Sequence, residues 1–282
     1  MLNTYLPINH YSEMTAKIQK LFSFIKVILK QPSLINLITD SNIVFEERFK
    51  QKYSNFISLP QIEIKDLNDQ IIIDRVESFL LDGSSLITDL QLLATLANRS
   101  DVKSYFEIGT WRGESVYNVA QFVQDCTTLN LSGEEMNAMG WPEKYALQHG
   151  ILSTKNPNIL HLTGNTTTFD FRGLKKKYDL IFIDGDHTFD MVLSDTKKVF
   201  KELLHDNSIV VWHDYAYSAQ KIRYEVFKAI LDAVGEENHQ HLYHPKNTMC
   251  AVYTKKRLPT TPFDEMQSPT KIFEINIKQK GF

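Results

Sequence analysis

Between about residues 85 and 254, short apolar runs alternate with segments of helical periodicity. A continuous apolar run is typical of a buried strand, and apolar residues three and four apart are typical of a helix. Strand–helix–strand units of this kind fold into a parallel sheet with right-handed crossover connections. The pattern therefore predicts an α/β fold with a mostly parallel sheet.

The individual apolar runs predict where the strands lie. We expect strands at 104–108, 127–131, 159–163, 179–184 and 208–213, followed by 241–243 and 248–254. We expect helices at 86–98, 114–124, 190–205 and about 222–234, and a looser segment before residue 159 that is helical over 141–150. The turn between the last two strands is so short that they should form an antiparallel hairpin.

Both ends of the chain differ in pattern from this region. Residues 1–65 are expected to form an N-terminal helical extension, 66–254 the main domain and 255–282 a C-terminal tail. Within the tail, alternation of apolar and polar residues over 273–278 predicts an extra, half-buried strand. The chain is therefore expected to be one α/β domain with an extension at each end.

The extension contains two expected helices, over 14–30 and 42–53. The first is amphipathic and carries Lys17, Lys20 and Lys26 mostly away from its apolar face. Such a helix can lie on a membrane surface, but more often it packs on its own domain or on a sister subunit. We favour packing, and a homo-oligomer remains open.

Composition excludes several classes of function. Lys and Arg total 31 against 34 Asp and Glu, a net charge of −3, which argues against a nucleic-acid partner. Cys126 and Cys250 lie far apart in apolar runs, which suits buried thiols in a reducing compartment. The apolar stretch 21–29 is too short to span a membrane, and it lacks a signal-peptide cleavage pattern. We therefore expect a cytoplasmic protein without a membrane span.

Glycine is scarce, at 11 of 282 residues, so the positions of the glycines are informative. Gly109 and Gly113 follow one expected strand and precede a helix, where glycine lets the backbone approach a ligand closely. Their G-x-x-x-G spacing differs from the nicotinamide and phosphate-loop patterns. Glu107 would repel a pyrophosphate, and it suits a ligand with a positive end, such as S-adenosylmethionine. A tight turn without a ligand is the alternative.

Acidic and histidine side chains come directly after two neighbouring expected strands. Asp184, Asp186 and His187 follow one strand, and His213 and Asp214 follow the next. Adjacent parallel strands lie about 4.8 Å apart, so these side chains can converge in the crevice where open α/β sheets bind ligands. Two carboxylates and an imidazole can form a divalent-metal shell. The alternative for any single residue is a helix cap or a hydrogen bond to backbone.

Taken in order, these motifs resemble a known family. The motifs EIGTWRGES, GNTTTFDF, YDLIFIDGDHTFDMVLSDTKKVF, SIVVWHDY and NTMCAVY are similar to the class I S-adenosylmethionine-dependent methyltransferases, and this resemblance implies a Rossmann-like α/β fold. Within them, the set resembles the methyltransferase-24 family, which is related to metal-dependent sugar and natural-product O-methyltransferases. The resemblance covers roughly residues 84–254, and the ordered combination is far more specific than any one motif.

The resemblance implies a set of cofactor-binding residues. Asn130 falls where the family usually has an acid that bridges the ribose hydroxyls, and an amide binds them less strongly. Glu134 or Glu135 is a candidate to compensate, and Asn165 falls near the adenine position. The full set implied for S-adenosylmethionine is Glu107, Gly109, Thr110, Gly113, Asn130, Asn165 and Asp184.

The resemblance also implies catalytic and metal-binding residues. Asp184 matches the first metal ligand and Asp186 the proposed base, with His187 as a further catalytic candidate. His213 and Asp214 stand where metal-dependent members have two oxygen ligands. Replacing an oxygen by imidazole weakens the case for Mg²⁺ and leaves Mn²⁺, another transition metal, or no metal.

The expected activity is therefore methyl transfer to a hydroxyl of a small molecule or saccharide. A non-catalytic or cofactor-binding scaffold with the same fold is the alternative, since Asn130 departs from the family pattern. A nicotinamide oxidoreductase is disfavoured by the glycine spacing and by Glu107.

Overall fold

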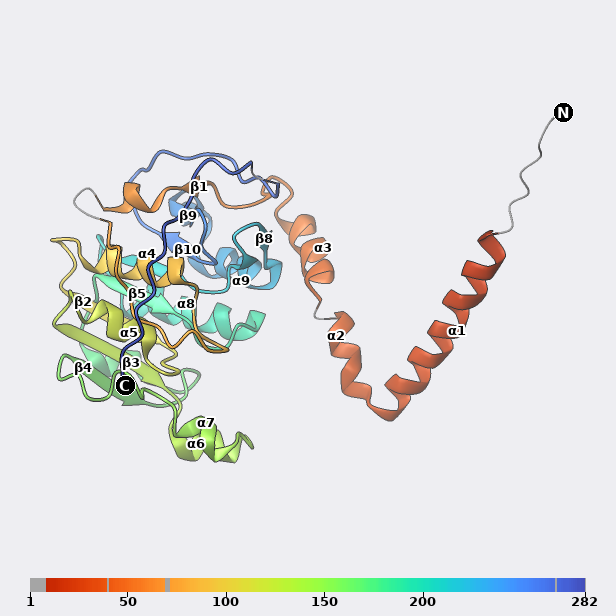
Figure 1. The fold of residues 1–282 in the computed structure, drawn as a ribbon, viewed down its shortest axis with the longest axis horizontal. Helices are drawn as coiled ribbons and strands as arrows, with labels where there is room; N and C mark the ends of the chain where they lie inside the picture. Colours follow the sequence, from red (N-terminus) through yellow and green to blue (C-terminus); the bar gives the residue numbers. More distant parts are fainter. Residues whose placement is uncertain (1–8, 40, 69–71, 267, 282) are drawn as a thin grey trace. The chain divides into compact units, whose positions relative to one another are not determined.

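The computed structural model describes residues 9–39, 41–68, 72–266 and 268–281. The chain divides into two compact units, Met1–Tyr53 and Ser54–Phe282. The first unit is helical, and the second contains the sheet (Figure 1).

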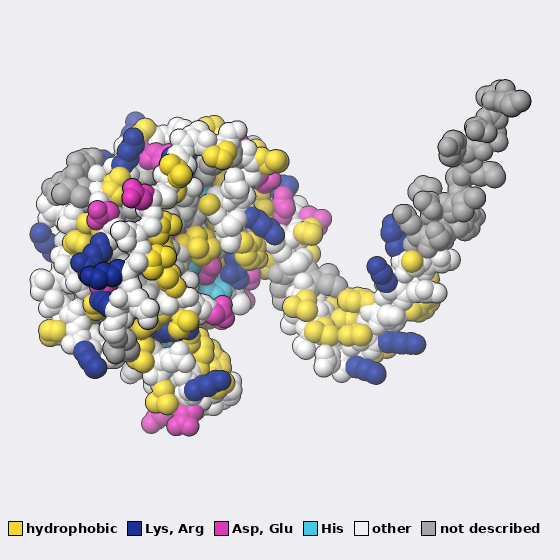
Figure 2. Space-filling view, in the orientation of Figure 1, with side chains coloured by type: hydrophobic (Ala, Val, Ile, Leu, Met, Phe, Trp, Pro, Cys, Tyr) yellow, Lys and Arg dark blue, Asp and Glu magenta, His cyan; other side chains and the backbone are white. Residues whose placement is uncertain are grey.

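The first unit confirms the two helices expected near the N-terminus. Gln31 and Pro32 end the first helix and start a short 3-10 turn, because proline cannot continue a helix. The apolar side chains of Ile18, Phe22 and Ile25 on the first helix are exposed, and Figure 2 shows hydrophobic side chains gathered along it between lysines. None of the described helices is long and apolar enough to cross a bilayer. The helical elements are α1 (Asn9–Lys30), η1 (Pro32–Ile35), α2 (Asn36–Thr39) and α3 (Asn42–Lys52).

The second unit is built on an eight-stranded sheet in the order β1-β9-β10-β6-β5-β2-β3-β4. The five consecutive strands β6, β5, β2, β3 and β4 are parallel, and β9 and β10 form the expected antiparallel hairpin. All seven strands expected between residues 85 and 254 are confirmed. The strands are β1 (Gln61–Ile62), β2 (Ser104–Ile108), β3 (Asp125–Asn130), β4 (Ile159–Thr163), β5 (Leu180–Ile183), β6 (Ile209–Trp212), β9 (Leu242–Pro245) and β10 (Ala251–Tyr253).

The strand order reverses direction next to β2. From β2 the chain adds β3 and β4 on one side, and it then returns to add β5 and β6 on the other. Ile108 of β2 is paired with Ile183 of β5, which is paired with Trp212 of β6. In open α/β sheets, ligands bind at the carboxyl ends of the strands beside such a reversal. The residues that follow these three positions therefore lie at the expected binding crevice.

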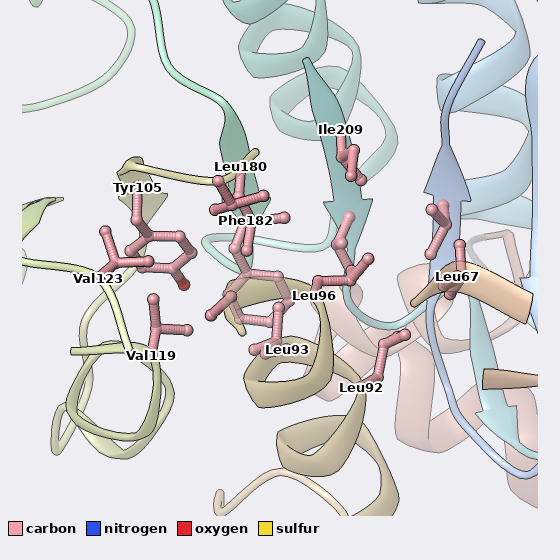
Figure 3. Close-up of a cluster of buried hydrophobic side chains, with 14 of the residues drawn as sticks. Leu67, Leu92, Leu93, Leu96, Tyr105, Val119, Val123, Leu180, Phe182 and Ile209 are labelled. Atoms are coloured by element: carbon pink, nitrogen blue, oxygen red, sulfur yellow. The ribbon is translucent and has the colours of Figure 1, made fainter. Parts of the chain in front are cut away.

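Helices pack on both faces of the sheet. Alternate strand residues point to opposite faces, so Tyr105 and Phe182 belong to a core with α4 and α5 (Figure 3). On the other face, the Trp212 indole donates a hydrogen bond to Thr196 of α8 at 2.8 Å. Both cysteines are free and buried. The main helices are α4 (Ile87–Ala97), α5 (Glu114–Val119), α8 (Phe189–Glu202) and α9 (Tyr224–Val234), with 3-10 turns η2 (Ile64–Leu67), η3 (Phe171–Leu174) and η4 (Glu236–His241).

The segment after β3 differs from its expected helix over 141–150. It contains two short helices instead, α6 (Gly133–Ala138) and α7 (Glu143–Ala146). Ser132 and Glu135 form a reciprocal capping box that starts α6, and Pro142 precedes α7. The helix expected over 141–150 is therefore shorter, because α7 ends at Ala146, and α6, which lies before that range, was not expected.

The expected strand over 273–278 is wrong. Phe273, Ile275 and Ile277 are exposed, and the described part of the tail has no strand there. The tail reaches the sheet edge elsewhere, where Thr261 exchanges two backbone hydrogen bonds with Gln61 of β1. Alternation of apolar residues makes a strand only when the segment packs and pairs in a sheet, and this segment does not. A further small antiparallel pair, β7 (Ala216–Ser218) and β8 (Lys221–Ile222), was not expected.

Candidate functional site

The candidate site lies at the carboxyl ends of β2, β5 and β6. Backbone pairing continues one residue beyond the strands: Asp184 N–H donates to Ile108 O at 2.8 Å, and His213 N–H donates to Ile183 O at 3.0 Å. This pairing holds Asp184 next to Gly109 on one side and next to His213 on the other. The expected convergence of the strand-end residues is therefore present.

Gly109 and Gly113 are required by the turn itself. Both have positive φ, +90° and +80°, a region that side chains with a β-carbon rarely adopt. A β-carbon on Gly109 would lie 2.0 Å from the carbonyl oxygen of Asp184, and one on Gly113 would lie 2.1 Å from Ser153 Oγ. The close approach that these glycines allow is thus to the chain's own backbone and side chains. Trp111, between them, also has positive φ, at 41°.

Glu107 lies fully buried in β2 beneath this turn. Its carboxyl group accepts hydrogen bonds from Tyr105 Oη at 2.6 Å and from Thr128 Oγ1 at 3.3 Å. Burial raises the pKa of Glu107 to about 8, against the opposing effect of these hydrogen bonds. Thr110 Oγ1 in turn lies 2.6 Å from Thr128 Oγ1. A buried acid of this kind favours a positive group nearby, which would restore its ionised form.

His213 lies among three carboxyl groups. Its Nδ1 is 3.1 Å from Asp184 Oδ1 and 3.2 Å from Asp214 Oδ2, and its Nε2 is 3.2 Å from Asp89 Oδ2. Burial alone would lower the pKa of His213, but the neighbouring carboxylates raise it well above 6.5. Burial would raise the pKa of Asp214, whereas its contacts with His187 and His213 lower it. The cluster therefore attracts positive charge strongly.

The donor atoms of this cluster fit a divalent cation. His213 Nδ1 is buried and makes no well-aligned hydrogen bond, although two carboxylate oxygens lie close to it. The side chains of Asp184 and Asp214 are 24% and 21% exposed, so a cation can reach them. One imidazole nitrogen with two carboxylate oxygens suits Mn²⁺ or another transition metal better than Mg²⁺. Asp214 also has positive φ, at 56°, a backbone strain typical of functional sites.

The two catalytic candidates lie at the mouth of this cluster. His187 Nδ1 is 2.9 Å from Asp214 Oδ2, and this contact raises the pKa of His187. Asp186 is exposed, and its Oδ1 accepts a hydrogen bond from Thr188 N at 2.7 Å. Both residues line a small hollow together with Asp184 and His213. A proton acceptor can therefore reach a group bound in that hollow.

Asn130 and Asn165, the candidates for ribose and adenine, have partners within the chain. The Asn130 side-chain amide lies 2.8 Å from His149 Nδ1, while Asn165 Oδ1 accepts two hydrogen bonds from Thr167. Burial lowers the pKa of His149 to about 4, so its neutral ring accepts from Asn130. Glu135 serves in the capping box of α6. The Asn130 side chain is therefore already held by His149.

Two further site residues were not expected from the sequence. Asp89 of α4 contacts His213, and it is the only acid in the apolar stretch of that helix. A lone acid among buried leucines is a signal that could have identified it. His149 belongs with Trp111 and Tyr145 to an aromatic group beside Asn130. The ring centroids of Trp111 and Tyr145 are 4.0 Å apart. No sequence spacing pointed to this group.

Comparison with known proteins places this site in a described domain. Residues 106–215 match the family model described as a methyltransferase domain. No curated protein sequence matches the chain.

Several solved structures are similar in part. An O-methyltransferase from Bacillus cereus, in complex with S-adenosylhomocysteine, is 15% identical over 62% of this chain and 84% of its own, with a TM-score of 0.43. A TDP-rhamnose 3'-O-methyltransferase of calicheamicin biosynthesis is 11% identical over 60% of this chain and 80% of its own, with a TM-score of 0.42. An amino-pentose methyltransferase from Micromonospora echinaspora is 15% identical over 45% of this chain, with a TM-score of 0.33, and the chain spans only 49% of that protein.

Proposed function

We propose that the protein is an S-adenosylmethionine-dependent methyltransferase, as the match of residues 106–215 to a methyltransferase domain supports, and that it transfers the cofactor's methyl group to a hydroxyl of a small molecule or saccharide. The observation that carries this proposal is the cluster of Asp184, His213 and Asp214 beside the Gly109 turn. Its carboxylate oxygens would bind a cation, and proton acceptors lie nearby, so the cluster could supply both kinds of help that a hydroxyl acceptor needs.

The cofactor would bind over the turn that follows β2. Glu107, Gly109, Thr110 and Gly113 would surround its methionine part, with the positive ammonium and sulfonium groups near the buried Glu107. Asn130 at the end of β3 would contact the ribose, and the segment after Gly164 would lie near the adenine. The supporting observation is that the turn after β2 and the carboxyl ends of β3 and β4 lie side by side along the same edge of the sheet.

Transfer to an alcohol needs help from the protein. The pKa of an aliphatic hydroxyl is close to that of water, about 15.7, so a neutral hydroxyl is a poor nucleophile. A divalent cation, when bound by Asp184, His213 and Asp214, would lower that pKa. The proton would then pass to His187 or Asp186, which line the same hollow.

Hydrogen bonding favours His187 as the proton acceptor. The contact with Asp214 fixes His187 Nδ1 and leaves Nε2 to accept a proton. This is the arrangement by which a carboxylate orients a catalytic imidazole. In Asp186, Oδ1 accepts the hydrogen bond from Thr188 N, which leaves Oδ2 to accept a proton.

The proposal is tested in two steps. Calorimetry with S-adenosylmethionine and S-adenosylhomocysteine should detect binding, and its absence at millimolar cofactor would overturn the assignment of the cofactor site. Radiolabelled methyl transfer to a panel of saccharides and small alcohols, with Mn²⁺, Mg²⁺ or chelator, then tests the acceptor class and the metal. Cofactor binding without turnover on any acceptor would favour the scaffold alternative.

A further inference from the structure

We propose that α1 binds along the surface of a bilayer that contains anionic phospholipid. The interaction surface belongs to the first of the two units alone. It goes beyond methyl transfer and does not depend on the proposed function.

The first observation is an apolar face on α1 that is open to solvent (Figure 2). At 3.6 residues per turn, apolar residues spaced three and four apart share one side of a helix. The exposed fractions on this face range from 44% to 76%, and a contiguous exposed apolar face is typical of an interaction site. The apolar face consists of Met14, Ile18, Leu21, Phe22, Ile25 and Leu29.

The second observation is that lysines border the apolar face on both sides. By helical spacing, Lys17 and Lys20 lie along one border, and Lys26 and Lys30 lie along the other. All four are exposed, and residues 14–30 contain no acid, the preceding Glu13 being the nearest. Positive charge is therefore concentrated here in a chain whose net charge is −3. Lysines in this position can lay their methylene groups on the apolar face and extend their charged ends toward headgroups.

Charge distinguishes between the two occupants that suit an apolar helix face. A second copy of α1 would bring its own border lysines against these, in a parallel or an antiparallel arrangement, and like charges repel. An anionic bilayer instead supplies opposite charge along both borders, and each lysine near its surface strengthens binding about fivefold. The border lysines therefore favour the lipid surface over a second copy.

The helix is suited to lie along a bilayer rather than to cross it. None of the described helices is long and apolar enough to span a membrane. α1 has 22 residues, about 33 Å of helix, and its polar side carries the lysines. A helix with one apolar and one basic side lies in the plane of the interface, with its apolar side at the boundary of headgroups and acyl chains.

Sedimentation of the full chain with lipid vesicles is the first test. We expect binding to vesicles of equal parts phosphatidylglycerol and phosphatidylcholine to be on the order of 10²-fold tighter than binding to phosphatidylcholine alone. Binding to the mixed vesicles should weaken as salt is added, because salt screens the lysines. No binding to the mixed vesicles, or equal binding to both kinds, would overturn the proposal. This comparison uses only the wild type, so it does not depend on how a variant folds.

Charge reversal at the borders tests the role of the lysines. Lys20→Glu/Lys26→Glu should weaken binding to the mixed vesicles at least about 25-fold, since each lost lysine contributes about fivefold. The control is Lys155→Glu/Lys197→Glu, which changes the net charge equally at two exposed lysines of the second unit. The control should bind as the wild type does. Equal weakening in both double variants would show that net charge, and not α1, governs binding, and the proposal would be wrong.

Replacement of apolar residues tests the face itself. Phe22→Ser/Leu29→Ser should lose binding to the mixed vesicles. Ile57→Ser/Leu147→Ser, at side chains that are 76% and 72% exposed in the second unit, should keep it. Light scattering of the same proteins tests the second copy. A wild-type dimer that Phe22→Ser/Leu29→Ser converts to a monomer, together with no vesicle binding, would make the apolar face a dimer interface and overturn the proposal.

Spin labels on opposite sides of α1 test its orientation on the vesicle. Labels are attached at Ile25→Cys on the apolar face and at Ser23→Cys on the polar side, while the two native cysteines are buried. We expect the label at residue 25 to be accessible to oxygen dissolved in the lipid and the label at residue 23 to be accessible to a water-soluble relaxation agent. Both labels in water on bound protein would show that another surface binds the lipid, and the proposal would be wrong.

Discussion

Gly109 packs so closely against Asp184 that a β-carbon on the glycine would lie 2.0 Å from the aspartate's carbonyl oxygen. The contact joins the turn that would hold the methyl donor to the strand end that would hold the cation. We therefore expect changes at Gly109 to affect folding as well as ligand binding.

Gly109→Ala should destabilise the protein by about 1–3 kcal/mol or more, because it combines a strained φ with a backbone clash. Urea unfolding measures the loss, and calorimetry measures cofactor binding. Gly133→Ala is the control, since a β-carbon there meets no atom within 4 Å. If Gly109→Ala kept normal stability but lost cofactor binding, the glycine would instead be needed to let the backbone come close to the cofactor.

Glu107 should make stability depend on pH in the absence of ligands. Its pKa is raised from 4.5 to about 8, so between these values the folded state holds a proton that the unfolded state has released. The free energy of unfolding should therefore fall as pH rises through this window, and Glu107→Gln should remove this contribution. Urea unfolding measured at several pH values between 4.5 and about 8 tests this prediction. If the free energy of unfolding fell equally steeply in Glu107→Gln, other groups would cause the pH dependence.

The same residue predicts how cofactor affinity depends on pH. A positive sulfonium or ammonium near Glu107 favours the ionised carboxylate, so affinity for S-adenosylmethionine should increase as pH rises toward about 8. Glu107→Gln should bind more weakly and without this dependence. Calorimetry at several pH values measures this affinity. A pH-independent affinity in the wild type would mean that the sulfonium and ammonium groups of the cofactor do not lie near Glu107.

Asp186→Asn and His187→Gln separate the two candidate bases. Replacing the true base should lower kcat by about 10²- to 10⁴-fold, and replacing the other should have a smaller effect. Asp186→Asn should leave Mn²⁺ affinity unchanged, because Asp186 bonds to Thr188 rather than to the cluster. A loss of Mn²⁺ binding in Asp186→Asn would make this residue a ligand and not a base.

Asn130→Asp tests the departure from the family pattern. A carboxylate accepts ribose hydroxyls more strongly than an amide does, so affinity for S-adenosylhomocysteine should increase severalfold. The neutral His149 can adapt by donating from Nδ1 to the new carboxylate. Unchanged or weaker binding in calorimetry would show that the ribose does not contact this position.

The sheet and its strand-end residues could be predicted because each depends on local pattern. A continuous apolar run identifies β5, and parallel pairing then brings Asp184 and His213 together. Asp89 could not be found in this way, because its contact with His213 joins residues 124 positions apart and depends on how α4 packs. The strand expected over 273–278 failed for the opposite reason, since the alternation was present but the segment forms no strand in the described structure.

The position of β5 between β2 and β6 has a thermodynamic consequence. Asp184 contacts the Gly109 turn through its backbone and His213 through its side chain. Binding of either the cofactor or the cation would therefore order Asp184. If cofactor binding orders Asp184, the cation binds to a site that is already organised. Linkage then requires reciprocity: the factor by which the cofactor tightens cation binding must equal the factor by which the cation tightens cofactor binding.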